Sequence, residues 1–285
     1  MPAARRVERG HGHFYSRIFM AGTVLLDVRD DVATLTLNRP TALNALSVEM
    51  MQDLGAAVRE LAARHDYGVV VIAGAGDHFM AGGDLKDFAR HFSLSKESRQ
   101  AAFRALIEQH VNPVIDTLQR LEQPVIARVR GACAGFGLSL MAGCDFAVAA
   151  DNALFTTAYV GIGLPGDGGA SYFLPRIVGR RRAAELLLLG DRFDAAEALR
   201  LGLLNRVAAP AALDAEVARL ATRLLAGPRR TQAEIKRLLL DSHDASLQAQ
   251  LQSEAEAFGR CSADADFVEG VSAFLDKRKP QFKAG

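Results

Sequence analysis

Tryptophan is absent from this 285-residue chain, and cysteine is scarce. The three cysteines, Cys133, Cys144 and Cys261, are odd in number and form no C-x-x-C pair, so they indicate neither a disulfide framework nor a zinc knuckle. The chain also has no marked excess of charge of either sign, because 34 basic residues balance 33 acidic ones. The net charge of +1 therefore gives no electrostatic reason to expect nucleic acid as a partner.

Long apolar runs are missing as well. No run approaches the roughly 18 residues that span a bilayer, so we expect no membrane segment and a cytoplasmic protein. Residues 1–20 are basic and lack a continuous apolar segment of signal-peptide length. Patterned sequence begins at Met20, and we expect residues 1–20 to form a flexible N-terminal extension. A mitochondrial-type targeting peptide is the alternative, although Glu8 interrupts it.

Short apolar, β-branched runs alternate with helical patterns in the first two thirds of the chain. The runs predict strands at Thr23–Val28, Val32–Asn38, Val69–Gly74, Pro124–Val129 and Asp145–Ala150. Ser47 is in position to cap a helix that continues to Leu61, and residues 97–121 form a second helical stretch. The alternation predicts an α/β core with parallel crossovers over residues 21–205.

Helical patterns dominate after Gly179. Asp194 and Glu197 have capping-box spacing, and Gly202 stands at the exit of the same helix. Two apolar stripes at helical spacing follow, namely Leu213, Val217, Leu220 and Leu224, and then Phe267, Val271, Phe274 and Leu275. We therefore expect residues 206–285 to form a helical C-terminal lobe.

Two glycine-rich turns follow predicted strands, in the segments HFMAGGDLKDF (His78–Phe88) and GACAGFGLSL (Gly131–Leu140). Each leaves backbone N–H groups free at the start of a helix, where they can point at an anion or a carbonyl oxygen. Either turn alone could be structural. Two such turns together suggest a pair of N–H donors that converge on one oxygen, which is an oxyanion hole.

A third glycine-rich turn holds Asp167 between two glycines. Gly161–Gly166 matches the dinucleotide fingerprint G-x-G-x-x-G, but arginines stand where its acidic residue belongs, so a tight turn is the better interpretation. A buried carboxylate is costly without a partner. Asp167 therefore either caps the following helix through Tyr172 or is a reactive group that the turn presents.

Four separated segments resemble, in the same order, the motifs of the crotonase superfamily, the enoyl-CoA hydratases and isomerases. They are LNRPTALNALS, FMAGGDLKDF, PVIARVRGACAGFGLSLMAGCDFAVAADNALF and EGVSAFLDKRKPQF. The resemblance runs from Val24 to about Phe282 and implies a crotonase-like spiral of ββα units with a C-terminal helical trimerisation lobe. It also implies a homotrimer or dimer of trimers, an acyl-CoA thioester substrate, and no metal or cofactor beyond the coenzyme A of the substrate.

The resemblance also implies the residues of the site. The oxyanion-hole donors are the backbone N–H groups of Gly83 and Phe136. The contacts to substrate and coenzyme A carry over to Ala42, Leu43, Ala81, Asp84, Leu85, Tyr159, Phe258 and Lys277.

The chain departs from the hydratases of this family at two positions. Those enzymes carry two glutamates where this chain has Ser139 and Tyr159, and neither replacement acts as a carboxylate near neutral pH. In the isomerase branch that the chain resembles, which includes the ring-isomerases of phenylacetate degradation, an aspartate occupies the turn of Asp167. One carboxylate can move a proton from the α-carbon to the γ-carbon, so we expect a 3-enoyl to 2-enoyl-CoA isomerase with Asp167 as its acid/base.

Three alternatives remain at this stage. The chain could be a hydratase in which Asp167 activates water, a non-catalytic acyl-CoA-binding protein, or a dehalogenase. The family's dehalogenase has a tryptophan beside its nucleophilic aspartate, at the position of Tyr159, and a histidine near His110 and Asn112. His78 is expected to face solvent. The apolar residues around Asp167 predict that desolvation raises its pKa above the ordinary aspartate value of about 3.9.

Overall fold

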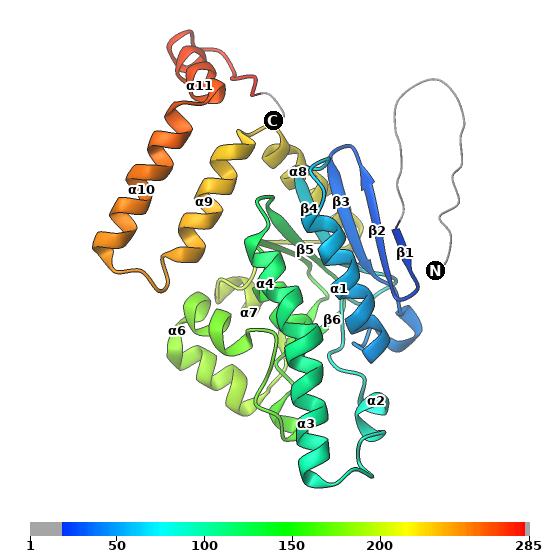
Figure 1. Cartoon of the computed structure of the whole chain (residues 1–285). Coiled ribbons are helices and arrows are strands. Elements are labelled where there is room, and N and C mark those ends of the chain that lie inside the picture. Colours follow the sequence, from blue (N-terminus) through cyan, green and yellow to red (C-terminus); the bar gives the residue numbers. More distant parts are fainter. Residues whose placement is uncertain (1–18, 283–285) are drawn as a thin grey trace.

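A seven-stranded sheet forms the centre of the computed structural model, which describes residues 19–282 (Figure 1). In spatial order its strands are β1 (Phe19–Ala21), β2 (Val24–Arg29), β3 (Val32–Leu37), β4 (Val69–Gly74), β5 (Val125–Val129), β7 (Phe146–Ala150) and β10 (Arg206–Ala208). Neighbours from β1 to β3 are antiparallel, and those from β3 to β10 are parallel. Most of the predicted N-terminal extension, residues 1–18, lies outside the described residues.

A second, smaller sheet consists of β6 (Ala132–Ala134), β8 (Leu154–Thr156) and β9 (Phe193–Asp194). The chain passes from one sheet to the other at Gly131, between β5 and β6. Gly131 has a φ of 54°, and a Cβ there would lie 2.2 Å from the carbonyl oxygen of Asp77. Only glycine fits this step, which brings β6 and the following helix next to the loop after β4.

Eleven α-helices surround the sheets within the described residues. They are α1 (Val48–Ala62), α2 (Leu85–Ala89), α3 (Lys96–Leu106), α4 (Asn112–Arg120), α5 (Phe136–Ala142), α6 (Ala170–Leu189), α7 (Ala195–Arg200), α8 (Leu213–Leu225), α9 (Arg229–Asp241), α10 (Leu247–Ser262) and α11 (Ala265–Leu275). The 3₁₀-helices are η1 (Pro40–Ala42), η3 (Val160–Ile162) and η4 (Pro210–Ala212). Within this described part, no helix is both long and apolar enough to cross a membrane.

The predicted helix caps are confirmed. Ser47 Oγ accepts a hydrogen bond from the N–H of Met50, and Asp194 accepts one from the N–H of Glu197. The predicted helix over residues 97–121 is built from α3 and α4 joined by a π-turn, η2 (Ile107–Val111). Pro113 lacks an N–H to continue the regular ladder, and the N–H of Asn112 bonds to the carbonyl of Ile107 five residues earlier.

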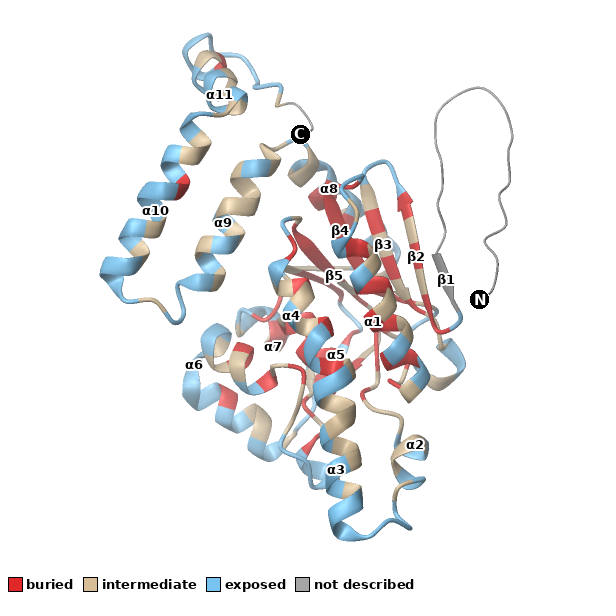
Figure 2. Cartoon of the chain, viewed as in Figure 1, coloured by how far each residue is buried: buried red, intermediate tan, exposed pale blue. Residues whose placement is uncertain are grey.

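Both faces of the large sheet are covered, and β4 is buried along its whole length (Figure 2). Val70 and Ile72 point into the core that α1 and α4 share, whereas Val69 and Val71 pack against α8. A parallel strand covered on both sides is expected to be continuously apolar, as this one is. The predicted C-terminal lobe, residues 206–285, therefore begins with two core elements, β10 and α8.

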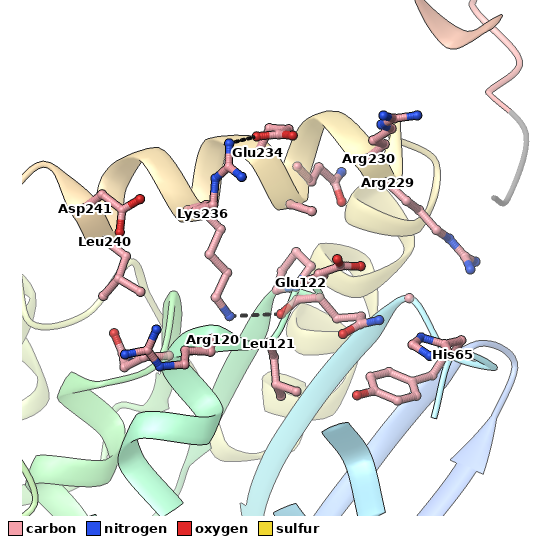
Figure 3. Close-up of a pocket in the computed structure, with 18 residues that line it drawn as sticks. His65, Arg120, Leu121, Glu122, Arg229, Arg230, Glu234, Lys236, Leu240 and Asp241 are labelled. Atoms are coloured by element: carbon pink, nitrogen blue, oxygen red, sulfur yellow. Dashed lines mark hydrogen bonds and ion pairs between the residues drawn. The ribbon is translucent and has the colours of Figure 1, made fainter. Parts of the chain in front are cut away.

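The helices from α9 onward stand away from the sheet (Figure 1). Lys236 extends from α9 toward the loop before β5, where its Nζ donates to the carbonyl oxygen of Gln123 (3.0 Å) (Figure 3). The same Nζ pairs with Asp145, the residue before β7 (2.8 Å). Large apolar side chains on α10 and α11 are exposed, with Phe258 at 74% and Phe274 at 84%. So much exposed apolar surface is unusual for a monomer and is typical of an interaction surface.

Candidate active site

The turn between β4 and α2 presents the backbone N–H of Gly83. Leu46 forms a parallel bridge with Gly83, in which its N–H donates to the carbonyl of Gly82 (2.7 Å) and its carbonyl accepts from the N–H of Asp84 (3.0 Å). The bridge therefore uses groups on either side of Gly83 and leaves the Gly83 N–H out of the pairing. Gly82 has a φ of 94°, which L side chains rarely adopt.

The second turn presents the N–H of Phe136, the first residue of α5. At this position an N–H has no carbonyl one turn earlier in the helix to bond. Gly135 before it has a φ of 52° and a ψ of −124°, a conformation that glycine alone adopts readily. A Cβ on Gly135 would lie 3.2 Å from the Cα of Gly82, so the two turns pack against each other through their glycines. Gly83 and Phe136 line one cavity.

Backbone hydrogen bonds hold the two turns together. Met80 N–H donates to the carbonyl of Ala132 (3.0 Å), and Ala134 N–H donates to the carbonyl of Met80 (2.8 Å). His78 adds to this contact, because its Nδ1 accepts from the N–H of Ala132 (3.0 Å). The expectation that His78 faces solvent is wrong, since the ring is half-buried against a segment 54 residues away. His78 helps to hold the two turns together through this contact, and nothing in the sequence around His78 indicates it.

Asp167 lies in the turn before α6 and accepts a hydrogen bond from the hydroxyl of Tyr159 at Oδ1 (2.6 Å). The alternative that Asp167 caps α6 through Tyr172 is wrong. The N-cap of α6 is Gly169, without a side-chain cap, and the N–H of Tyr172 donates to the carbonyl of Gly169 (2.8 Å). Gly163, with a φ of 72°, closes the 3₁₀-helix η3, so the glycine run before Asp167 makes a tight turn.

Burial raises the pKa of Asp167, and the hydrogen bond from Tyr159 lowers it in part. The net direction is upward, which confirms the prediction made from its apolar neighbours. Burial and the negative charge of Asp167 also raise the pKa of Tyr159. Tyr159 therefore keeps its proton near neutral pH and remains a hydrogen-bond donor to the carboxylate.

Ser139 and Tyr159, which the family resemblance aligns with the hydratase glutamates, contact each other. Ser139 is 1% exposed on α5, and its Oγ lies 3.0 Å from the Tyr159 hydroxyl oxygen. The sequence predicted only that both residues lack the chemistry of a carboxylate. Their hydrogen bond could not be predicted, because it joins residues 20 positions apart on separate elements.

The cavity between these groups has a volume of about 120 Å³ and is largely apolar. Its lining includes the predicted site residues Ala81, Gly83, Leu85, Phe136, Tyr159 and Asp167. Phe88 and Phe103, which the sequence did not single out, also line it and pack edge to face with centroids 5.1 Å apart. No cluster of three or more His, Cys, Asp or Glu side chains suited to a metal occurs in residues 19–282. The cavity can therefore hold an apolar acyl group beside one carboxyl group and two turn N–H groups.

Other predicted contacts adjoin the cavity or lie away from it. The carbonyl of Leu43, next to Ala42, accepts from the N–H of Ala81 (3.0 Å), which places this loop beside the first turn. Asp84 caps α2 through the N–H of Lys86 (3.0 Å) and pairs with Arg39 (2.9 Å), so its side chain is engaged within the chain.

Phe258 on α10 and Lys277 after α11 do not line the cavity. Figure 1 shows α10 and α11 at the end of the molecule opposite α2 and α3. Their contacts with coenzyme A stay a prediction. A larger hollow, about 790 Å³, lies beneath α9 and is lined by charged side chains of both signs (Figure 3). None of the predicted site residues lines it.

The sequence pattern of the enoyl-CoA hydratase/isomerase family matches residues 27–285. The chain is 36% identical over 261 residues to crotonyl-CoA hydratase of Syntrophomonas wolfei, covering 91% of this chain and 97% of that protein. It is 35% identical over 259 residues to 1,2-epoxyphenylacetyl-CoA isomerase of Escherichia coli, again covering 91% of this chain and 97% of that protein. The crystal structure of an enoyl-CoA hydratase from Mycobacterium smegmatis matches with a TM-score of 0.82 at 38% identity, covering 91% of this chain and 98% of that one. Four motifs, the fold and these similarities agree, and the chain belongs to the enoyl-CoA hydratase/isomerase family of the crotonase superfamily.

Proposed function

We propose that this protein is an enoyl-CoA isomerase that converts 3-enoyl-CoA into 2-enoyl-CoA, with Asp167 as its acid/base. The observation that carries the proposal is the half-buried carboxyl group of Asp167, which lines the same cavity as Gly83 and Phe136. The resemblance to the family aligns Ser139 and Tyr159 with the hydratase glutamates, and the hydroxyl groups of these two residues contact each other.

The reaction needs one base and a place for negative charge. Asp167 removes a proton from the α-carbon, and the electron pair of the broken C–H bond delocalises onto the thioester oxygen of a dienolate. The N–H groups of Gly83 and Phe136 stabilise this oxygen, a contribution worth on the order of a hundredfold to a thousandfold in rate for each donor. Asp167 then returns the proton to the γ-carbon, so that atoms and charges balance without water.

The protonation behaviour of Asp167 suits this role. A carboxyl group whose pKa is raised by burial is a stronger base when ionised and still releases its proton later in the cycle. A thioester α-proton is only weakly acidic, so both the base strength and the oxyanion stabilisation contribute to its removal.

Hydration is the second candidate, favoured by similarity to a protein named crotonyl-CoA hydratase. Adding water requires one group to activate the water and another to protonate the α-carbon. Within the described residues, Asp167 is the one carboxylate that lines the cavity. A single carboxylate is sufficient for a proton shuttle between two carbons, so isomerisation needs fewer additional groups. A non-catalytic acyl-CoA-binding role remains the third candidate.

Replacing Asp167 by asparagine tests the proposal. Asp167→Asn preserves the side-chain volume and an oxygen that accepts from Tyr159, but it removes the base. We expect a folded protein that binds acyl-CoA and isomerises 3-enoyl-CoA at least a hundredfold more slowly, on the order of the contribution of a general base. The exposed Asp191, changed to Asn, is the matched control and should keep parental activity.

The assay supplies 3-enoyl-CoA and 2-enoyl-CoA separately and follows both ultraviolet absorbance and the incorporation of labelled water. Equal isomerase activity in Asp167→Asn and the parent would refute the assigned role. Hydration of 2-enoyl-CoA by the parent, without isomerisation of 3-enoyl-CoA, would favour the hydratase. Binding of both compounds without turnover would favour the non-catalytic role.

A further inference from the structure

On the basis of the function proposed above, we infer that Tyr159 and Ser139 are positioning residues for Asp167. They would direct one carboxylate oxygen toward the substrate and connect the base to α5, whose first residue carries a predicted oxyanion-hole donor. The inference depends on two hydrogen bonds, between Tyr159 and Asp167 and between Ser139 and Tyr159, and on the packing of the turn against α5.

The direction of the hydrogen bonds follows from the number of protons. The Tyr159 hydroxyl has a single proton, which it donates to Oδ1 of Asp167 over 2.6 Å. The 3.0 Å contact between Ser139 Oγ and the Tyr159 oxygen then requires Ser139 to be the donor. Both hydroxyl dipoles therefore point toward the carboxylate, and such a chain strengthens each of its hydrogen bonds.

The chain starts on α5, close to the predicted oxyanion hole. The one proton of Ser139 goes to Tyr159 over the shorter contact (3.0 Å), so the carbonyl oxygen of Gly135, 3.4 Å from Ser139 Oγ, is a neighbour and not a second acceptor. The turn itself also packs on α5, because a Cβ at Gly168 would lie 2.7 Å from the ring of Phe136 and 3.1 Å from the Cβ of Ser139. The base and one donor thus share a rigid support.

The arrangement distinguishes the two oxygens of Asp167. Oδ1 is occupied by Tyr159, and no hydrogen bond within the described residues reaches Oδ2. The second oxygen is therefore the one left to take the substrate proton. The Tyr159 bond also favours the ionised carboxylate, which opposes the effect of burial on its pKa.

Three single variants test this inference. Tyr159→Phe removes the donor to Asp167, and Ser139→Ala removes the donor to Tyr159. Tyr172→Phe is the matched control, since it deletes a tyrosine hydroxyl from a residue outside the cavity lining. The first readout is the pH profile of kcat/KM for 3-enoyl-CoA. The second is the titration of the Asp167 carboxyl in the free protein by carbon-13 NMR of labelled aspartate, assigned by difference from Asp167→Asn.

Loss of the Tyr159 bond should make the carboxylate harder to ionise. We expect Tyr159→Phe to move the acid limb of the profile, and the Asp167 titration, to higher pH by about one unit or more, the size of a hydrogen bond to a charged group. Ser139→Ala should shift both in the same direction by less, and Tyr172→Phe should shift neither. The dissociation constant of a saturated acyl-CoA should stay within about threefold of the parent, because the positioning acts on the reaction rather than on binding.

The possible failures are distinguishable. An unchanged titration and pH profile in Tyr159→Phe, with Asp167→Asn inactive, would overturn the positioning role and leave the isomerase proposal standing. Weakened acyl-CoA binding without a shifted titration would make Tyr159 a substrate contact instead. Full activity of Asp167→Asn would refute the proposed function, while the NMR titration would still decide whether Tyr159 controls the carboxyl.

Discussion

Substituting Gly135 by alanine tests whether the two turns form one oxyanion hole. Gly135 has a φ of 52° and a ψ of −124°, and an added Cβ would lie 3.2 Å from the Cα of Gly82. Two effects follow from this geometry. The alanine strains its own backbone, and it pushes against the backbone of the other turn, which precedes the Gly83 donor.

The magnitudes separate these two effects. Backbone strain of this kind costs on the order of 1–3 kcal/mol of unfolding free energy. Displacing a donor by about 1 Å can reduce the rate about a hundredfold, and losing one donor costs on the order of a hundredfold to a thousandfold. We therefore expect Gly135→Ala to lose about 1–3 kcal/mol of stability and at least a hundredfold in kcat/KM for 3-enoyl-CoA.

Gly202→Ala is the matched control. Gly202 follows α7 with a φ of 80°, and no atom outside its own chain neighbours lies within 4 Å of a Cβ built there. It should cost about 1–2 kcal/mol for the left-handed conformation and leave kcat/KM unchanged. Urea unfolding and steady-state kinetics measure the two quantities. A folded Gly135→Ala variant with parental kcat/KM would refute the assignment of the Phe136 N–H to the oxyanion hole.

Two further predictions concern stability and assembly. Because burial raises the pKa of Asp167, its ionisation destabilises the fold at neutral pH. Asp167→Asn should therefore raise Tm at pH 7, by about 2–4 °C for each kcal/mol of desolvation cost that it removes. This gain in Tm should vanish as the pH falls through the raised pKa toward the ordinary aspartate value of about 3.9. A gain in Tm that persists at low pH would contradict this reasoning. We also expect light scattering to show a trimer or dimer of trimers. The variant Phe274→Asp, which places a charge on the exposed face of α11, should weaken this assembly. A parent protein that is a stable monomer at micromolar concentration would contradict the trimer.

The central strands were predictable from sequence because their local pattern and their burial agree. Val69–Gly74 is continuously apolar, and β4 has the same bounds and is buried throughout. The strands β6, β8, β9 and β10 have only two or three residues, too few to show a periodicity. The predicted boundary at residue 205 leaves β10 outside the α/β core, because the pairing of Arg206 with Val148 depends on a contact 58 residues away.

The candidate site was predictable where one residue carries the signal by itself. Asp167 is a carboxylate among glycines and apolar residues, and the upward shift of its pKa was anticipated. The contacts of His78 and Ser139 were not, because each bonds to a group on a different element. Residue type indicates what a side chain can do, whereas the fold decides which partner it meets.

The two proposed donors of this site belong to the backbone, and this has an evolutionary consequence. Substituting the side chain of Phe136 would leave its N–H in place as long as the turn keeps its shape. Three side chains would determine which reaction occurs. Ser139 lies on α5, Tyr159 precedes η3, and Asp167 lies in the turn after η3. Each of them can therefore mutate separately. New activities can then arise by single substitutions without rebuilding the charge-stabilising element. Such a lineage is expected to diversify in chemistry faster than in fold, and relatives of similar identity named as a hydratase and an isomerase fit that expectation.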